Sequence, residues 1–239
     1  MTTSNPALRA DTFRSAPLDT TGGTMTIRGT AAKTLILLGL ATLSASFSWT
    51  HAGGMGLAML GLIVGGIAGL ILCFKQAWAP VLAPVYATFE GLFLGGISSL
   101  FAARYGGMVM QAVLLTFGTL FALLAAYQTG YIRASAKLKV GVIAATGGIC
   151  LVYFLSIILG FFHIQIPGIF GNGPIGIIFS LIVVGIAALN LILDFDLIEQ
   201  GAASGAPKYM EWYGGFALML TLVWLYLEIL RLLAKLRDR

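Results

Sequence analysis

The stretch GMGLAMLGLIVGGIAGLILCF, residues 54–74, contains no charged side chain and only apolar residues and glycine. A helix that crosses the hydrocarbon core of a bilayer needs about 20 mostly apolar residues. An open, irregular backbone would leave polar groups unsatisfied in lipid, whereas a helix satisfies them within the segment. The stretch therefore predicts a membrane-spanning helix.

Six more apolar runs of similar length lie on either side of it, at residues 31–50, 79–103, 107–129, 140–162, 174–198 and 212–234. The composition agrees, because 59% of the 239 residues are hydrophobic and 10% are charged. The sequence does not show the alternating segments of about 10 residues that are typical of a membrane β-barrel. We therefore expect an all-α fold, a polytopic bundle of seven transmembrane helices in a lipid bilayer over residues 31–239.

The first 30 residues differ from the rest, being rich in Thr, Ser, Pro and Arg without an apolar core. This composition favours a disordered tail over a cleaved secretory signal. A cytoplasmic N-terminus places nine of the 14 Lys and Arg residues inside, as membrane proteins prefer. These nine are Arg9, Arg14, Arg28, Lys33, Lys75, Arg133, Lys137, Lys139 and Lys208. The basic C-terminal segment LLAKLRDR conflicts with that preference, so the side of the C-terminus is left open.

Acids inside the apolar runs are the candidates for function, because a charged side chain at the bilayer centre costs roughly 2.5–3.5 kcal/mol on insertion scales. Glu90 is the deepest single acid, in the third run. Gly91 and Gly95 follow it at a spacing that lets a neighbouring helix pack closely. The position fits a functional carboxyl and a structural one, hydrogen-bonded to a neighbouring helix, equally well.

Three acids lie within LNLILDFDLIEQG, residues 189–201. Asn190 and Asp194 are four residues apart and share a helical face, which would let the Asn190 amide donate to Asp194. Asp196 points about 200° away from Asp194, so both carboxylates cannot face the same cavity. Glu199, like Glu211 further along the chain, is expected to be a solvated loop carboxylate.

The last run contains Glu228 with Arg231 three residues later, a spacing that permits an intrahelical ion pair. Thr221 lies seven residues before Glu228 on the same face, so a polar stripe toward the bundle interior is the alternative. If the last two helices are antiparallel neighbours, Asp194 and Glu228 approach each other. Two carboxyls in a low dielectric would then share one proton, which would make the pair sensitive to pH.

The sequence lacks the common enzyme motifs H-E-x-x-H, G-x-G-D, G-x-S-x-G, the P-loop and the Rossmann fingerprint. The two histidines, His51 and His163, lie at loop ends without a nearby acid, which makes a poor metal site. The net charge of +5 indicates anchoring at the membrane surface instead of nucleic-acid binding. We therefore expect no enzyme activity, no cofactor and no nucleic-acid partner.

The segments VYATFEGLFLGGIS, LNLILDFDLIEQG and MEWYGGFALMLTLVWLYLEILRLL resemble those of the Bax inhibitor-1 family, in its bacterial YccA-like branch. The resemblance covers the chain from about residue 30 to the end. It implies a bacterial inner-membrane protein in which three hairpins surround the last helix. It also implies a pH-sensitive Ca²⁺ leak channel, gated by one acid on the sixth helix and one on the seventh.

Carried onto this sequence, the seventh-helix acid is Glu228, where the family usually has Asp. The sixth-helix acid is Asp194, with Asp196 as the alternative register. The resemblance thus implies a cation path gated by Asp194 and Glu228. Our leading hypothesis adds Glu90, which would line or brace that path, and closure of the path at low pH.

The arginine of the family's second helix has no counterpart in residues 54–74, and Lys75 or Arg231 would have to replace it. The long N-terminal tail and this missing arginine favour an alternative function. In that alternative the protein conducts nothing and regulates another membrane protein, such as a quality-control protease.

Overall fold

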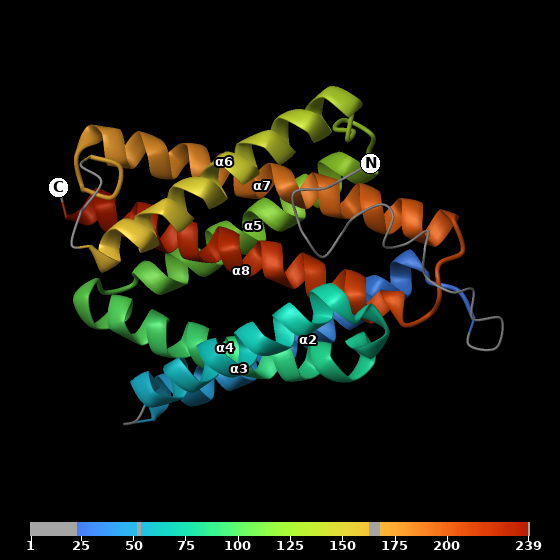
Figure 1. The fold of residues 1–239 in the computed structure, drawn as a ribbon, viewed down its shortest axis with the longest axis horizontal. Helices are drawn as coiled ribbons and strands as arrows, with labels where there is room; N and C mark the ends of the chain where they lie inside the picture. Colours follow the sequence, from blue (N-terminus) through green and yellow to red (C-terminus); the bar gives the residue numbers. More distant parts are fainter. Residues whose placement is uncertain (1–22, 52–53, 163–167, 239) are drawn as a thin grey trace. The chain divides into compact units, whose positions relative to one another are not determined.

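The computed structural model describes residues 23–51, 54–162 and 168–238, and most of them are helical (Figure 1). The long helices are α2 (Ile27–Thr50), α3 (Gly54–Phe74), α4 (Ala79–Arg104), α5 (Met108–Gln128), α6 (Ala136–Phe161), α7 (Pro174–Ala203) and α8 (Met210–Arg237). A short 3₁₀ helix, η1 (Gln76–Trp78), precedes α4. All seven long helices are apolar and long enough to cross a membrane. The predicted all-α class with seven spans is therefore confirmed.

Helix α2 begins before the predicted run starts, at Ile27. The Thr26 hydroxyl caps the helix by accepting a hydrogen bond from the Gly29 amide at 2.9 Å. The predicted tail over residues 1–30 thus overlaps the first turn of α2. Residues 1–22 of that tail lie outside the described part of the chain.

Helix α6 also begins before its apolar run, at Ala136. Ser135 caps it, because the serine hydroxyl accepts a hydrogen bond from the Leu138 amide at 3.2 Å. The first turn carries Lys137 and Lys139, which lower the local hydropathy without opposing a helix. Caps therefore set the starts of α2 and α6 more closely than the edges of the apolar runs do.

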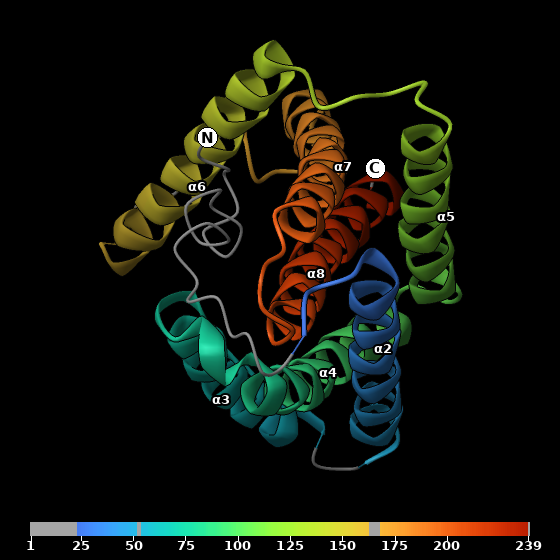
Figure 2. The ribbon, with the colours of Figure 1, turned by 90° about the vertical axis from the view of Figure 1, so that its right-hand side faces the viewer.

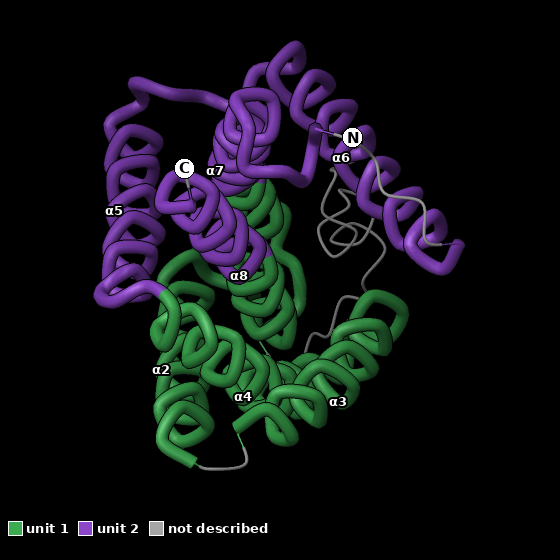
Figure 3. The backbone as a smooth tube through the Cα atoms, turned by 90° about the vertical axis from the view of Figure 1, so that its left-hand side faces the viewer, with its two compact units in different colours: residues 1–104, 194–220 green, residues 105–193, 221–239 purple. Residues whose placement is uncertain are grey.

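The helices divide between two compact units, coloured separately in Figure 3. Unit 1 contains the chain up to Arg104 together with Asp194–Leu220, so it holds α2, α3, α4, the end of α7 and the start of α8. Helix α4 lies between α2 and α3 and packs against both (Figure 2). Gly91 and Gly95 of α4 approach the backbone of α2 so closely that a Cβ on either would collide with it. The close packing predicted from their spacing is confirmed.

Unit 2 contains Tyr105–Leu193 and Thr221–Arg239, and thus α5, α6, most of α7 and the second half of α8. Polar side chains connect its apolar helices. Asn190 on α7 donates to the Thr146 hydroxyl on α6 at 2.9 Å. A second connection runs from the Tyr153 hydroxyl on α6 to Glu228 on α8.

The outward sides of several helices carry large apolar residues. Leu35 of α2, Leu114 of α5 and Phe154 of α6 are each more than 60% exposed. Lipid, not water, suits a surface of this kind. Helix α8 differs, because 67% of its most apolar 18-residue segment is buried, against 17% for α6. The arrangement of three hairpins around the last helix stays a prediction.

Candidate functional site

Among the described residues, three acids of the predicted apolar runs are buried within membrane-crossing helices. Glu90 on α4 is 9% exposed, Asp194 on α7 is 0% exposed, and Glu228 on α8 is 2% exposed. These are the three residues that the sequence singles out for a cation path. The surroundings of each differ, and the differences determine what each carboxyl can do.

Glu228 lies in a network of hydrogen bonds with Arg231 and Tyr153. Arg231 Nη1 donates to both Glu228 carboxylate oxygens, at 2.8 Å and 3.1 Å, which confirms the intrahelical ion pair. The Tyr153 hydroxyl on α6 donates to Glu228 Oε1 at 2.8 Å. Thr221, seven residues earlier on α8, is also buried, so the predicted polar face and the ion pair occur together.

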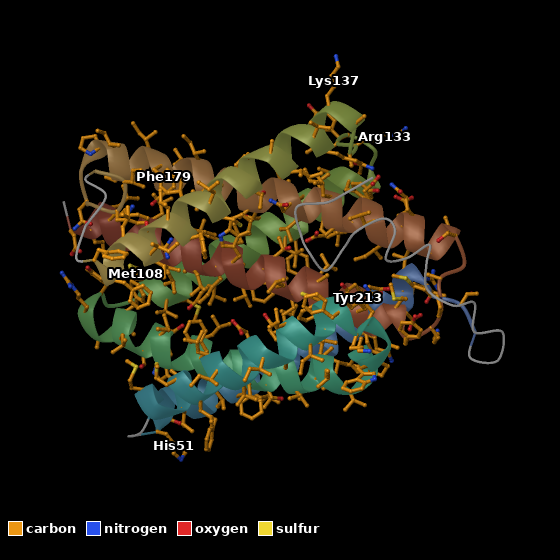
Figure 4. The ribbon with its side chains drawn as sticks, viewed as in Figure 1. His51, Met108, Arg133, Lys137, Phe179 and Tyr213 are labelled. Atoms are coloured by element: carbon orange, nitrogen blue, oxygen red, sulfur yellow. The ribbon has the colours of Figure 1, made fainter. Side chains whose placement is uncertain are left out.

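Tyr153 is the member of this network that sequence reasoning missed. It lies in the apolar run of α6, 75 residues before Glu228. Its ring packs against Phe170 and Phe179 at centroid distances of 6.0 Å and 6.4 Å, and Figure 4 labels Phe179 on α7. A tyrosine inside a membrane span needs a partner for its hydroxyl, which was the available signal. The identity of that partner depends on how the helices pack.

Asp194 and Asp196 differ in burial as their helical positions predict. Asp194 is fully buried, whereas Asp196 is partly exposed and accepts a hydrogen bond from Gln200, one turn later. Asn190, on the same face as Asp194, donates to Thr146 and to the Ile186 carbonyl, each at 2.9 Å. These two donations do not include the one to Asp194 that the sequence suggests. Asp194 remains the better gate candidate of the two aspartates because it is the buried one.

Glu90 lies against Gly65 of α3, where an added Cβ would come within 3.3 Å of its carboxylate. Among the described residues, no side chain donates a hydrogen bond to Glu90. The structural alternative required a hydrogen bond from a neighbouring helix. The choice between a functional and a structural role for Glu90 stays a prediction.

The expectation that Glu211 is a solvated loop carboxylate is wrong. Glu211 lies in the first turn of α8 and is 1% exposed. Its Oε1 accepts from the Thr26 amide at 3.0 Å and from the Thr26 hydroxyl at 2.8 Å, and Lys208 pairs with it at 2.9 Å. Glu199, by contrast, is exposed as predicted. Glu211 therefore has a structural role, joining the start of α2 to the start of α8.

Lys235 is another residue whose surroundings the sequence does not reveal. It belongs to the basic C-terminal segment, yet it is 4% exposed. Its ammonium donates to the backbone carbonyls of Ile169 and Gly176, each at 3.0 Å. Lys235 and Arg231 thus both have partners inside unit 2. Neither is a loop charge of the kind that the preference for cytoplasmic Lys and Arg counts.

A family model described as Bax inhibitor 1 like matches residues 5–238. The chain belongs to this family. No curated protein and no solved structure gives a significant match. The Bax inhibitor 1 like match includes Glu90, Asp194, Glu228 and every described helix, and it supports an integral membrane protein. The YccA-like branch, the bacterial inner membrane and the cytoplasmic N-terminus stay predictions.

The expectation that this Bax inhibitor 1 like chain holds no resident metal also stays a prediction. Within residues 23–51, 54–162 and 168–238, no three His, Cys, Asp or Glu residues are grouped closely enough to hold a metal ion. His51 is exposed at the end of α2 and carries a label in Figure 4. His163 lies outside the described residues.

Proposed function

We propose that this protein passes cations, Ca²⁺ among them, across the membrane, with Asp194 and Glu228 as the gate and Glu90 beside the path. The observation that carries the proposal is the burial of Asp194 and Glu228 in two membrane-crossing helices. Ionisable groups at such positions are costly and usually belong to a transport path or a proton relay. Hard cations prefer oxygen ligands, which carboxylates supply.

The two gate acids lie at different distances from the turn between their helices. Asp194 is nine residues from the end of α7 at Ala203, or about 13 Å of helix. Glu228 is 18 residues from the start of α8 at Met210, or about 27 Å of helix. We propose that each carboxyl interacts with a passing cation in its own right, a role that needs no shared proton.

Protonation of these two carboxylates closes the path. An ionised carboxylate attracts a partly dehydrated cation strongly in a low dielectric, and a protonated one does not. Flux is therefore highest when both acids are ionised, and it falls as the pH is lowered.

The test is Ca²⁺ flux into proteoliposomes at about pH 6 and about pH 8, for the wild type and Glu228→Gln. We expect wild-type flux to fall at the lower pH and Glu228→Gln to lose most of that response. Wild-type flux equal to that of protein-free liposomes would reject the channel.

A regulator that conducts nothing and binds another membrane protein is the second candidate function. Helix α3 favours it, because Gly54–Phe74 contains no basic residue where the family resemblance expects an arginine. Deletion of residues 1–22 separates the two functions, since a channel keeps its flux and a regulator that uses this tail loses its partner. The deletion has to stop before Gly23, whose carbonyl accepts from the Lys208 amide at 3.1 Å.

A further inference from the structure

Tyr153 contacts both members of the Glu228–Arg231 ion pair. Its hydroxyl donates to Glu228 Oε1 at 2.8 Å and accepts from Arg231 Nη1 at 2.7 Å. The same Nη1 donates to Glu228 Oε1 at 2.8 Å. A phenol, a guanidinium and a carboxylate from α6 and α8 therefore close a ring of three hydrogen bonds. Each member of the ring holds the other two.

The aromatic ring of Tyr153 is fixed independently of its hydroxyl. Phe170 and Phe179 pack beside it, and the Arg231 guanidinium lies 5.2 Å from its centroid. A cation over an aromatic face is attracted by the ring itself. The packing of the ring thus fixes the position of the hydroxyl beside the ion pair.

The two charges of the pair differ in their access to the surroundings. The Glu228 side chain is 2% exposed, whereas that of Arg231 is 43% exposed. An arginine at such a position can move its charged end to the membrane surface while its stem stays in place. The carboxylate, in contrast, has no such route. The guanidinium is therefore the part that can leave, and its departure would uncover an uncompensated carboxylate.

We propose that Tyr153 is the positioning residue of a lock that holds Arg231 on Glu228 and keeps that carboxylate from binding cations. The inference rests on the proposed role of Glu228 in the gate. While the lock is closed, the guanidinium compensates the charge of Glu228, and Tyr153 and Arg231 occupy Oε1. Departure of Arg231 opens the lock and makes the carboxylate available to a cation.

The lock depends on the hydroxyl of Tyr153, so Tyr153→Phe is the informative variant. It removes two hydrogen bonds and keeps the ring against Phe170 and Phe179. Tyr131→Phe is the matched control, because Tyr131 is 89% exposed outside the helices. The probe is dicyclohexylcarbodiimide, which modifies carboxyl groups in apolar surroundings. It is applied to proteoliposomes at a single pH, and mass spectrometry quantifies the adduct on Glu228.

We expect Tyr153→Phe to raise the Glu228 adduct about tenfold, the size of effect that a lost hydrogen bond to a charged group produces. Tyr131→Phe should match the wild type. The adduct on Glu90 is the internal reference, because general loosening of the protein would raise both adducts together. An unchanged Glu228 adduct in Tyr153→Phe, or a parallel rise at Glu90 and Glu228, would overturn the lock.

Ca²⁺ flux through the same proteoliposomes separates the lock from the proposed channel. If both proposals hold, Tyr153→Phe raises flux, and it has no further effect in a Glu228→Gln background. A raised Glu228 adduct with no wild-type flux would keep the lock and reject the channel. Wild-type flux that Tyr153→Phe leaves unchanged would keep the channel and overturn the lock.

Discussion

Glu199 and Glu211 show what decides the role of a single acid in this chain. The sequence presents both as carboxylates beside apolar runs, yet Glu199 is exposed and Glu211 is buried. The difference is Thr26, 185 residues away, which donates two hydrogen bonds to Glu211. No local pattern reveals a partner at that separation. Glu228 and Arg231 were predictable as a pair because they lie one turn apart on the same helix.

The stability of the protein should depend on Glu211. Glu211→Gln keeps the shape of the side chain and removes the charge that pairs with Lys208 and strengthens the bonds from Thr26. We expect a loss of about 1–3 kcal/mol in the free energy of unfolding, the range for a weakened buried charged hydrogen bond. Thermal unfolding in detergent measures it. Glu199→Gln is the control, and equal melting temperatures for the two variants would contradict the structural role of Glu211.

At the scale of the helix, the apolar runs predict where each helix lies but not always where it begins and ends. Helix α3 begins and ends with its run, at Gly54 and Phe74. Helix α7 continues past the predicted end at residue 198 to Ala203. Hydropathy reports how well a segment suits lipid, whereas a helix continues as long as its backbone and local side chains allow. The bond from Gln200 to Asp196 is one such local support beyond the apolar run.

The contact between α2 and α4 should depend on small residues. In Gly95→Ala, the added methyl would meet the backbone of Ala45 on α2, and backbone cannot move aside cheaply. We expect destabilisation of about 1–3 kcal/mol, the range for overpacking. Thermal unfolding in detergent is again the measurement.

Gly118→Ala is the matched control for that change. Gly118 lies inside α5 and has nothing within 4 Å of an added Cβ. Replacing a helical glycine by alanine at an open position should be neutral or stabilising, by up to about 1 kcal/mol. Destabilisation of Gly118→Ala as large as that of Gly95→Ala would show that helical glycine in general, and not the α2–α4 contact, is what matters.

For the whole molecule, composition and the lengths of the apolar runs predict the seven-helix membrane fold, because the bilayer allows few other solutions. The same reasoning finds Glu90, Asp194 and Glu228, since each is an acid where acids are costly. It does not find Tyr153 or the partners of Lys235, because those depend on contacts between helices far apart in the chain. The sequence therefore identifies three of the buried acids, whereas the burial of Glu211 and Lys235 and the partners of Glu228 depend on the fold.

The central claim is that Asp194, and not Asp196, gates a cation path. It is tested by Ca²⁺ flux into proteoliposomes at about pH 8, where free carboxyls are ionised, for Asp194→Asn and Asp196→Asn. Asp194 is fully buried and Asp196 is partly exposed, and the two substitutions change the same chemical group. We predict that Asp194→Asn lowers flux about tenfold or more, as the loss of about 1.4 kcal/mol of cation stabilisation would, and that Asp196→Asn retains it. Full flux in Asp194→Asn, or loss of flux in Asp196→Asn alone, would contradict the account.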